Sequence, residues 1–459
     1  MTNMMIKNAM SRRSFLGGTL SLGALAGCRA FRAPTGLLSG DGANVTLGVI
    51  SDIHIDAAKG DFRKFGDAVQ FERTLRWFDA QGVDGVVVAG DMADNGMINQ
   101  LECVGEAWFR VFPEGRSMRD GRPVEQLFVY GNHDIEGQTY DKFDFRYFHR
   151  PSFEAELIRR DPAAAWHRVF REDYAPIWLK SVKGYQFVGA HWSLGKNSWD
   201  GIPEVEDWFR TNAGRLRRDR PFFFIQHCHP KDTVYGAEAW CPDKGYATRA
   251  LSAFPNAVAL TGHSHTSLTD ERSIWQGAFT SVGTASLRYG GSVDRYEQRQ
   301  GLLLKVYDDR MVFVRRDFLH DASLGDDWVV PLPVAEAKPF SFEPRRAKGE
   351  APEFPSEAQV TCRREKEGWL LTIPSASAGR VRAFRYEIAT GLKGNDGQPI
   401  VFRAYDAKYN MPLSMAGAPT HYLVKDSELA KGVAGKPERF VVTPLSCFDN
   451  RGQSRTVSL

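Results

Sequence analysis

The chain has 459 residues, of which 42% are hydrophobic, 25% charged and 12% aromatic. This is the composition of a globular protein, and the length is sufficient for two domains with large cores. Lys and Arg number 59 against 56 Asp and Glu, which gives a formal net charge of +3. The near balance excludes a global basic field, so no surface specific to nucleic acid is evident.

The N-terminus has the pattern of an export signal. The twin arginines of Ser11–Leu16 precede an uncharged run that ends at Gly27, which is typical of a twin-arginine (Tat) signal and too short for a spanning helix. Leu25–Cys28 resembles a lipobox, in which the cysteine is acylated; ordinary cleavage after Ala26 is the alternative. We therefore expect an exported protein of the periplasm or cell surface, anchored to the membrane by lipid at Cys28.

Five cysteines remain if Cys28 carries lipid. An odd number leaves at least one unpaired thiol in an oxidising compartment. The spacing permits Cys362 to pair with Cys447, and Cys228 with Cys241. Buried thiols without disulfides are the alternative.

An alternating α/β pattern begins with the apolar run Val45–Ile50, which predicts a buried strand. Phe71, Leu75 and Phe78 then recur at helical spacing, so we expect an amphipathic helix. Val86–Ala89 follows as a second apolar strand. Strand, helix and strand in this order form a βαβ unit, which implies parallel strands.

The same pattern continues through the next two hundred or so residues. We expect a helix over 98–112, strands over 126–130, 185–190, 222–225 and 257–260, and strands near 279–282, 302–307 and 311–315 that complete a second sheet. The segment 135–181 is an insertion. Its aromatic residues Trp166, Phe170, Tyr174 and Trp178 recur every four residues, which predicts a helix whose aromatic stripe packs in the core.

The C-terminal part has a different pattern. Six prolines between residues 321 and 356 indicate a semi-rigid linker. Seven short alternating segments follow in about 100 residues, which is typical of a β-sandwich and resembles the fibronectin and immunoglobulin type. The predicted organisation is an export signal at 1–28, a tether at 29–44, an α/β domain at 45–320, a Pro-rich linker at 321–355 and a β-sandwich at 356–459.

Residues with metal-ligand chemistry follow five of the predicted strands. They are Asp52 and His54, then Gly90-Asp91 with Asp94, Gly131-Asn132-His133-Asp134, His227, and Gly262-His263 with His265. Because ligands bind beyond the carboxyl ends of strands in α/β sheets, we expect these side chains to converge. Imidazole suits Zn and Fe, while carboxylate and amide oxygens suit Mn and Fe.

These five motifs, in this order, resemble the calcineurin-like metallophosphoesterase family over roughly residues 45–320. The resemblance implies a four-layer α/β/β/α sandwich, to which the all-β sandwich is appended, and two divalent or trivalent metal ions (Mn, Zn, Fe or a mixture). One ion would take Asp52, His54 and His265. The other would take Asn132, His227 and His263, and Asp91 would bridge the two.

The resemblance also implies the catalytic roles. A hydroxide that bridges the metals would attack the phosphorus atom. His133 would stabilise the developing charge or protonate the leaving oxygen, with Asp94 fixing its orientation. His229 stands two residues after His227 and is the alternative ligand at that position.

The implied function is the hydrolysis of phosphomonoesters or phosphodiesters by an exported enzyme. Asn95 stands where protein Ser/Thr phosphatases carry arginine, and Asp94 where purple acid phosphatases carry a tyrosinate ligand. These departures leave phosphatases, phosphodiesterases and nucleotidases that act on small or surface phosphoesters. The alternative is a non-catalytic surface lipoprotein whose β-sandwich contacts glycan or envelope; the simpler role for the sandwich is packing on the α/β domain.

Overall fold

The computed structural model describes residues 42–56, 67–139, 156–193, 201–291, 297–406, 408–415, 417–429 and 436–459. The export signal, Cys28 and most of the tether lie outside these ranges, so export and lipid anchoring stay predictions. Within the described ranges, no helix has both the length and the apolar character that a membrane crossing requires.

The first sheet combines strands from widely separated parts of the sequence. Its order is β12-β11-β10-β1-β2-β3, and β13 pairs with β11. The strands are β1 (Val45–Ile50), β2 (Gly85–Ala89), β3 (Glu125–Val129), β10 (Gln300–Val306), β11 (Arg310–Asp317), β12 (Ala322–Ser323) and β13 (Trp328–Pro331). β1, β2 and β3 are parallel, which confirms the predicted βαβ unit.

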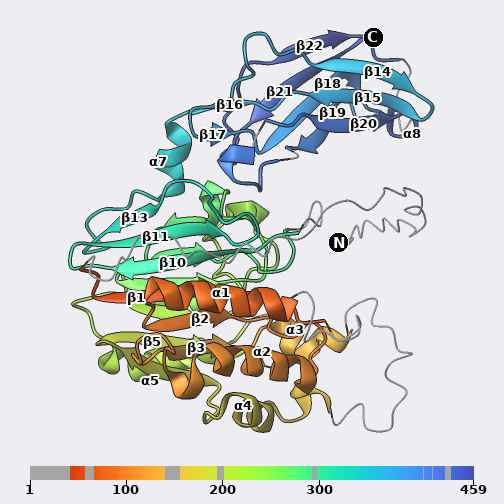
Figure 1. The fold of residues 1–459 in the computed structure, drawn as a ribbon. Helices are drawn as coiled ribbons and strands as arrows, with labels where there is room; N and C mark the ends of the chain where they lie inside the picture. The colour runs from red at the N-terminus through yellow and green to blue at the C-terminus, as the bar shows by residue number, and fades with distance from the viewer. Residues whose placement is uncertain are drawn as a thin grey trace. The chain divides into compact units, whose positions relative to one another are not determined.

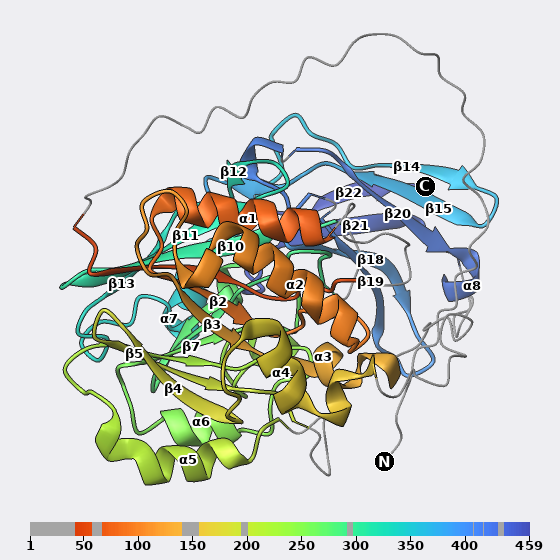
Figure 2. The same ribbon diagram turned by 60° about the horizontal axis from the view of Figure 1, so that its bottom comes forward.

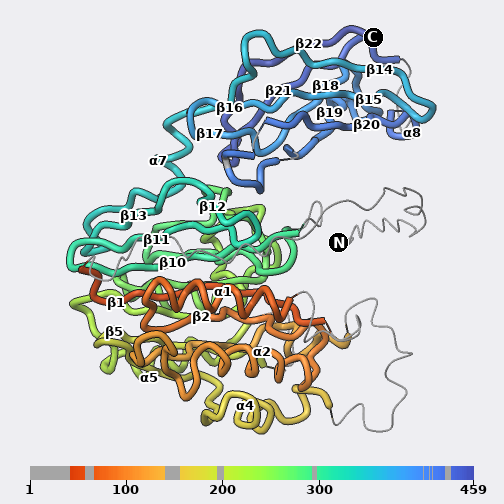
Figure 3. Tube along the Cα trace, viewed as in Figure 1, coloured from red at the N-terminus to blue at the C-terminus, as the bar shows by residue number. Residues whose placement is uncertain are grey.

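The second sheet has the order β4-β5-β6-β7-β9-β8. Its strands are β4 (Ile177–Val182), β5 (Tyr185–Ala190), β6 (Phe222–Ile225), β7 (Ala257–Thr261), β8 (Ile274–Gln276) and β9 (Thr280–Gly283). The prediction that strands near 302–307 and 311–315 join this sheet is wrong. They are β10 and β11, and β10 pairs antiparallel with β1 (Figure 3).

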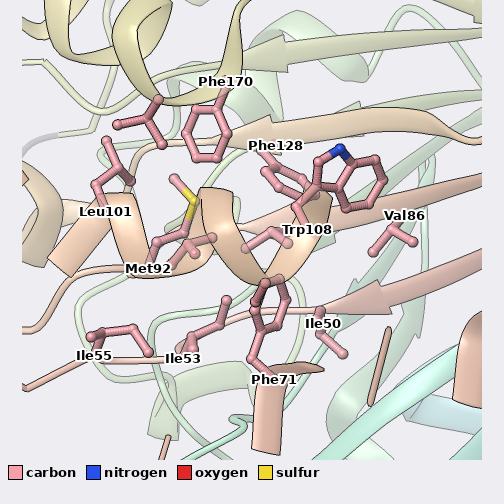
Figure 4. Packing of buried hydrophobic residues seen from close by; sticks show 14 of the residues in the cluster. Ile50, Ile53, Ile55, Phe71, Val86, Met92, Leu101, Trp108, Phe128 and Phe170 are labelled. Carbon is pink, nitrogen blue, oxygen red and sulfur yellow. The ribbon is translucent and has the colours of Figure 1, made fainter. Parts of the chain in front are cut away.

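Helices cover the outer faces of both sheets (Figures 1 and 2). The helices are α1 (Asp67–Gln81), α2 (Ile98–Val111), α3 (Asn132–Glu136), α4 (Pro162–Phe170), α5 (Glu204–Asn212), α6 (Tyr246–Leu251), α7 (Phe342–Ala347) and α8 (Asp426–Leu429). α1 and α2 pack on the first sheet through the cluster in Figure 4, which includes Phe71 and Trp108. α5 and α6 pack on the second sheet through a separate cluster.

Alternation along the strands separates these layers. Val87 in β2 and Phe223 in β6 belong to one hydrophobic cluster between the two sheets, while their neighbours Val86 and Phe222 belong to the clusters under the helices. Successive side chains of a strand point to opposite faces, so a continuous apolar run fills two layers at once. The predicted four-layer α/β/β/α arrangement is confirmed.

The predicted aromatic helix is shorter than its four-residue repeat suggests. α4 ends at Phe170 because Arg171 adopts a left-handed conformation (φ 60°). Trp166 and Phe170 are buried in the core, as predicted. Trp178 lies instead in β4, where it packs against the cluster between the sheets. A spacing of four therefore persists across a helix end and into a strand.

The segment assigned to a linker, 321–355, begins with β12 and β13 of the first sheet and contains α7. Trp328 and Val330 in β13 are buried beside Phe313, whereas Val329 between them is exposed. β13 pairs with β11 alone within this sheet, and Pro331 ends it, a position that an edge strand tolerates. The prolines concealed this strand from the sequence pattern.

The C-terminal part is all-β apart from α8. One sheet contains β14 (Thr361–Glu365), β15 (Gly368–Ile373) and β20 (Thr420–Lys425); another contains β19 (Pro399–Tyr405), β18 (Arg385–Lys393), β21 (Arg439–Leu445) and β22 (Arg455–Ser458); β16 (Ser377–Ala378) pairs with β17 (Val381–Arg382). Leu371 in β15 and Ile388 in β18 share one core. These additional all-β sheets agree with the predicted fold class, whereas the fibronectin-like type stays a prediction.

The described cysteines form no disulfide, so neither Cys362–Cys447 nor Cys228–Cys241 is bridged. Cys228 and Cys447 are buried. This outcome corresponds to the alternative of buried thiols without disulfides.

Candidate metal centre

The candidate ligands lie on loops at the carboxyl ends of five strands. Asp52 and His54 follow β1, Asp91 and Asp94 follow β2, Asn132 and His133 follow β3, His227 follows β6, and His263 and His265 follow β7. Both sheets therefore contribute to the same region. Most of these side chains are buried, and only Asp94 and His133 retain 21% and 23% of their side-chain exposure.

Four of the side chains form a first group. The ligand atoms of Asp52, His54, Asp91 and His265 lie within 4.8 Å of one another. His265 Nε2 is 2.9 Å from Asp52 Oδ1 and 3.1 Å from His54 Nε2. His54 Nε2 is also 3.7 Å from Asp91 Oδ2. Two nitrogens and two carboxylates thus face a common point.

A second group contains Asp91, His227 and His263. His227 Nε2 is 3.0 Å from Asp91 Oδ2, and the rings of His227 and His263 are 4.8 Å apart. Asp91 is a member of both groups. The Asp91 carboxylate therefore lies beside the two imidazoles of the second group and beside the three other ligand candidates of the first group.

Backbone carbonyl oxygens orient two of the imidazole rings. Nδ1 of His227 donates to the carbonyl of Ala89 (2.7 Å), and Nδ1 of His265 donates to the carbonyl of Tyr289 (3.1 Å). A carbonyl can only accept, so the proton lies on Nδ1 and the Nε2 lone pair faces the group. Metal-binding histidines use this arrangement, because the outer hydrogen bond fixes the tautomer and the ring.

Several polar atoms in these groups are buried without a hydrogen bond. Within the described residues they include Asp52 Oδ1, His227 Nε2 and His263 Nε2. Such atoms are costly because burial removes their water and nothing replaces it. A cation held between them would satisfy all three, and imidazole with carboxylate is a donor set for Zn, Fe or Mn. The residues present therefore fit metal ions.

The carboxylates of the site are ionised despite their burial. Burial alone raises the pKa of Asp52, but the adjacent His265 ring outweighs it and keeps the pKa well below its usual range. Burial lowers the pKa of His227, yet the Asp91 carboxylate raises it to about 9. These shifts show strong attraction between the carboxylates and any positive charge at this position.

Asn132 is the first residue of α3 and is buried. The next residue, His133, donates its backbone N–H to Asp91 Oδ1 (2.8 Å), so the start of α3 is held at the shared carboxylate. Asp134 accepts from the N–H groups of Gly131 (2.8 Å) and Ala93 (2.7 Å). These bonds join the loops that follow β2 and β3.

His133, Asp94 and His54 form a third group. His133 Nδ1 donates to the backbone carbonyl of Asp94 (2.8 Å), while the nearest Asp94 carboxylate oxygen is 3.8 Å from it. That carboxylate accepts instead from His54 Nδ1 (3.0 Å) and pairs with Arg288 (3.1 Å). The backbone of Asp94 thus holds His133, and its side chain holds His54.

His229, the alternative to His227, lies outside all three groups. Its Nδ1 bonds Thr261 Oγ1 (2.8 Å), and burial lowers its pKa to about 3. The geometry therefore brings His227, and not His229, to Asp91.

Sequence reasoning missed three residues beside the centre. Arg288 pairs with Asp94 and contacts the carbonyl of His54, the Tyr289 ring is 4.5 Å from the His265 ring, and the Trp240 ring is 4.7 Å from the His263 ring. Arg288 and Tyr289 follow β9, so their place beyond a strand end was an available signal. Trp240 does not directly follow a strand, so the sequence offered no comparable indication that it lies at the site.

The ligand loops contain an unusual number of left-handed residues. Positive φ values of 50° to 71° occur at Asp52, His54, Asp91, His263 and His265. Non-glycine residues rarely adopt this conformation, which costs on the order of 1 kcal/mol each and concentrates at functional sites. At Gly262, a Cβ atom would lie 2.5 Å from Asp52 Oδ2, so only glycine permits this approach.

Fold and site together define a candidate two-metal centre at the strand ends of a four-layer α/β/β/α domain. A family model described as calcineurin-like phosphoesterase matches residues 45–267. The resemblance that the five motifs carry is therefore confirmed over residues 45–267.

Solved structures are similar at low identity. One is a dimetal phosphatase from Danio rerio, with 13% identity, 63% of this chain and 99% of that chain covered, and a TM-score of 0.38. Another is a purple acid phosphatase from yellow lupin (Lupinus luteus) seeds, with 12% identity, coverage of 62% and 53%, and a TM-score of 0.38. A comparison with curated proteins gives no match. Likenesses this distant say nothing about activity.

Proposed function

We propose that the protein is a metal-dependent phosphoric ester hydrolase. Asp52, His54 and His265 would hold one ion, and Asn132, His227 and His263 would hold the other. Asp91 would contact both. The observation that carries the proposal is the position of the Asp91 carboxylate, which belongs to both groups of ligand candidates. A carboxylate shared in this way is what a two-ion site requires.

Two ions of Mn, Zn or Fe would supply Lewis-acid activation of water and neutralise the charge of a phosphoryl group. The chain supplies the proton. His133 keeps the proton on Nδ1 through the Asp94 carbonyl, so Nε2 is the atom that gains or gives one. The partial exposure of this ring allows a leaving oxygen to reach it. His133 is therefore the proposed general acid or transition-state stabiliser.

The proposed substrates are small or surface phosphomonoesters or phosphodiesters. Asn95 leaves the loop after β2 without the arginine of the protein phosphatases. Export, a lipid anchor at Cys28 and glycan contact by the C-terminal sheets remain separate proposals that rest on the sequence pattern alone.

The proposal is tested with purified Asp91→Ala and His133→Ala variants, assayed on an aryl phosphate after reconstitution with Mn, Zn or Fe. Both variants should lose hydrolysis, by a factor of roughly 100 to 10,000 for His133. Metal content, measured by mass spectrometry, should fall in Asp91→Ala and stay at the wild-type level in His133→Ala, because His133 contacts the site without joining the two ligand groups.

The matched control is His421→Ala, which removes an exposed histidine of β20 outside every group. It should change neither metal content nor turnover. Wild-type turnover in either site variant contradicts the mechanism. A metal-loaded wild type that hydrolyses neither monoesters nor diesters favours the non-catalytic alternative.

A further inference from the structure

Trp240 is the only exposed aromatic residue in the described part of the chain. The other large hydrophobic side chains that are exposed there are aliphatic: Met118, Leu319, Val329, Val401, Met415 and Leu459. Trp240 retains 47% of its exposure. Leaving so much of an indole in water is unfavourable, because this side chain has one of the largest apolar surfaces to bury.

The indole lies at the candidate metal centre. Its ring centroid is 4.7 Å from that of His263, with 34° between the ring planes. His263 belongs to the second ligand group with Asp91 and His227. Trp240 therefore combines two properties that no other described residue combines, namely direct contact with a ligand candidate and a large aromatic surface in solvent.

Hydrogen bonds of Asp243 tie the loop that carries Trp240 to a neighbouring segment. Asp243, three residues later, is buried and accepts from the N–H groups of Lys231 (2.9 Å), Gly245 (2.8 Å) and Ala247 (2.9 Å). Its own N–H donates to the carbonyl of His229 (2.8 Å). The loop is thus tied to the segment that begins at His227, so Trp240 keeps its place relative to the ligand group.

Shielding of His263 does not account for this tryptophan. A side chain that only covers a ligand would gain stability by burying its outer surface as well, and nearly half of this indole stays exposed. A fixed, exposed aromatic surface beside a reacting centre is suited to stacking against a flat ring, and ordering costs little because the loop is already held.

We propose that Trp240 stacks on a planar ring in the leaving group of the substrate, so that the site prefers aryl or nucleoside phosphoesters to alkyl ones. This inference rests on the proposed phosphoesterase function and names its substrate class. The shared chemistry is a flat aromatic ring in the leaving group, which is either an aryl group joined directly to the ester oxygen or a nucleobase joined to it through the sugar.

The experiment compares ligands that differ only in the ring. Adenosine 5′-monophosphate and ribose 5-phosphate share the ester and the sugar, and kcat/KM is measured for both with the Mn-reconstituted protein. Phenylphosphonate and methylphosphonate resist hydrolysis, and their Kd values are measured by calorimetry. The wild type should favour the ring-bearing member of at least one pair roughly tenfold, the size expected for one stacking contact.

Trp240→Leu keeps an apolar side chain but removes the ring, and it should abolish the preference while leaving the ring-free member unchanged. Trp240→Phe should restore most of the preference, which excludes misfolding as the cause. Met118→Ala removes another exposed apolar side chain, one that has no contact with the ligand groups, and should have no effect. A response of the nucleotide pair alone identifies a nucleobase, and a response of the phosphonate pair alone identifies an aryl group.

The inference is overturned if Trp240→Leu changes kcat/KM or Kd equally for both members of each pair, or changes neither. These outcomes are distinct from failure of the proposed function, in which the metal-loaded wild type hydrolyses neither ester. The phosphonate pair still shows in that case whether Trp240 stacks on an aromatic ring, because binding requires no turnover.

Discussion

At the scale of single residues, the contacts of Asp94 separate two roles. Its carbonyl accepts from His133 Nδ1, and its carboxylate accepts from His54 Nδ1 while it pairs with Arg288. Burial raises the pKa of Asp94, but the bond from His54 and the Arg288 charge lower it further than burial raises it. The carboxylate is therefore ionised and holds the His54 ring toward the first ligand group.

Substitution of Asp94 should act through His54. In Asp94→Ala, we expect metal affinity to fall by about 10- to 100-fold, the usual effect of losing an outer partner of a metal-binding histidine. Equilibrium dialysis against Mn measures this affinity. Asp94→Asn keeps an oxygen acceptor for His54 and should lose less. Unchanged affinity in Asp94→Ala would show that His54 needs no such partner.

Some site residues could be predicted from the local sequence, and others could not because their contacts join distant parts of the chain. Asp52, His54 and Asp91 were predictable because each follows an apolar strand within a few residues. Arg288 meets the carbonyl of His54 across 234 positions. No local spacing encodes such a contact, and neither does the approach of Trp240 to His263, because both depend on how two sheets pack.

At the scale of elements, the loop after β2 depends on Gly90. Its φ is +91°, and a Cβ atom would lie 2.4 Å from His227 Nδ1 and 2.8 Å from the Cα of Gly131. Both neighbours belong to other ligand loops. The loop after β2 therefore meets the loops after β3 and β6 at a point where no side chain fits.

Gly90→Ala should disturb both stability and metal binding. We expect a loss of about 1–3 kcal/mol from backbone strain, and more if His227 is displaced, together with reduced metal content. Urea denaturation and metal analysis measure the two effects. The matched control is Gly121→Ala, where φ is +73° but no atom lies within 4 Å of the new Cβ. It should lose stability and keep its metal. Similar metal loss in both variants would refute the role of close packing.

The positions of the strands in the sequence were more predictable than their hydrogen-bonded neighbours in the sheets. The strands from β1 to β7 that lead to the ligand loops match their apolar runs, because a strand buried on both faces leaves a clear signal. The position of β10 beside β1 joins residues about 250 apart. Periodicity indicates that a strand exists and which face is apolar, but hydrogen-bond partners depend on the whole sheet. β13 was missed because Pro331 at its end and the prolines that follow it suggested a linker.

At the scale of the whole molecule, the ligand groups connect the two sheets. Asp52, His54 and Asp91 extend from the first sheet, and His227, His263 and His265 extend from the second. The sheets otherwise meet through the hydrophobic cluster that includes Val87 and Phe223. Bound metal ions would thus add a polar connection at one edge of an apolar interface, where ionised carboxylates and orphaned imidazole nitrogens already face each other.

Metal removal should therefore lower the stability of the folded chain. A ligand that binds only the folded state stabilises it by about 2.7 kcal/mol at one hundred times its Kd. We expect the Tm of the Mn-loaded protein to fall by several degrees in a chelator and to recover when Mn is restored. Asp91→Ala should show almost no difference between the two conditions, because it lacks the carboxylate common to both groups. A wild-type Tm that ignores the chelator would mean that no ion links the sheets, and the proposed chemistry would lose its basis.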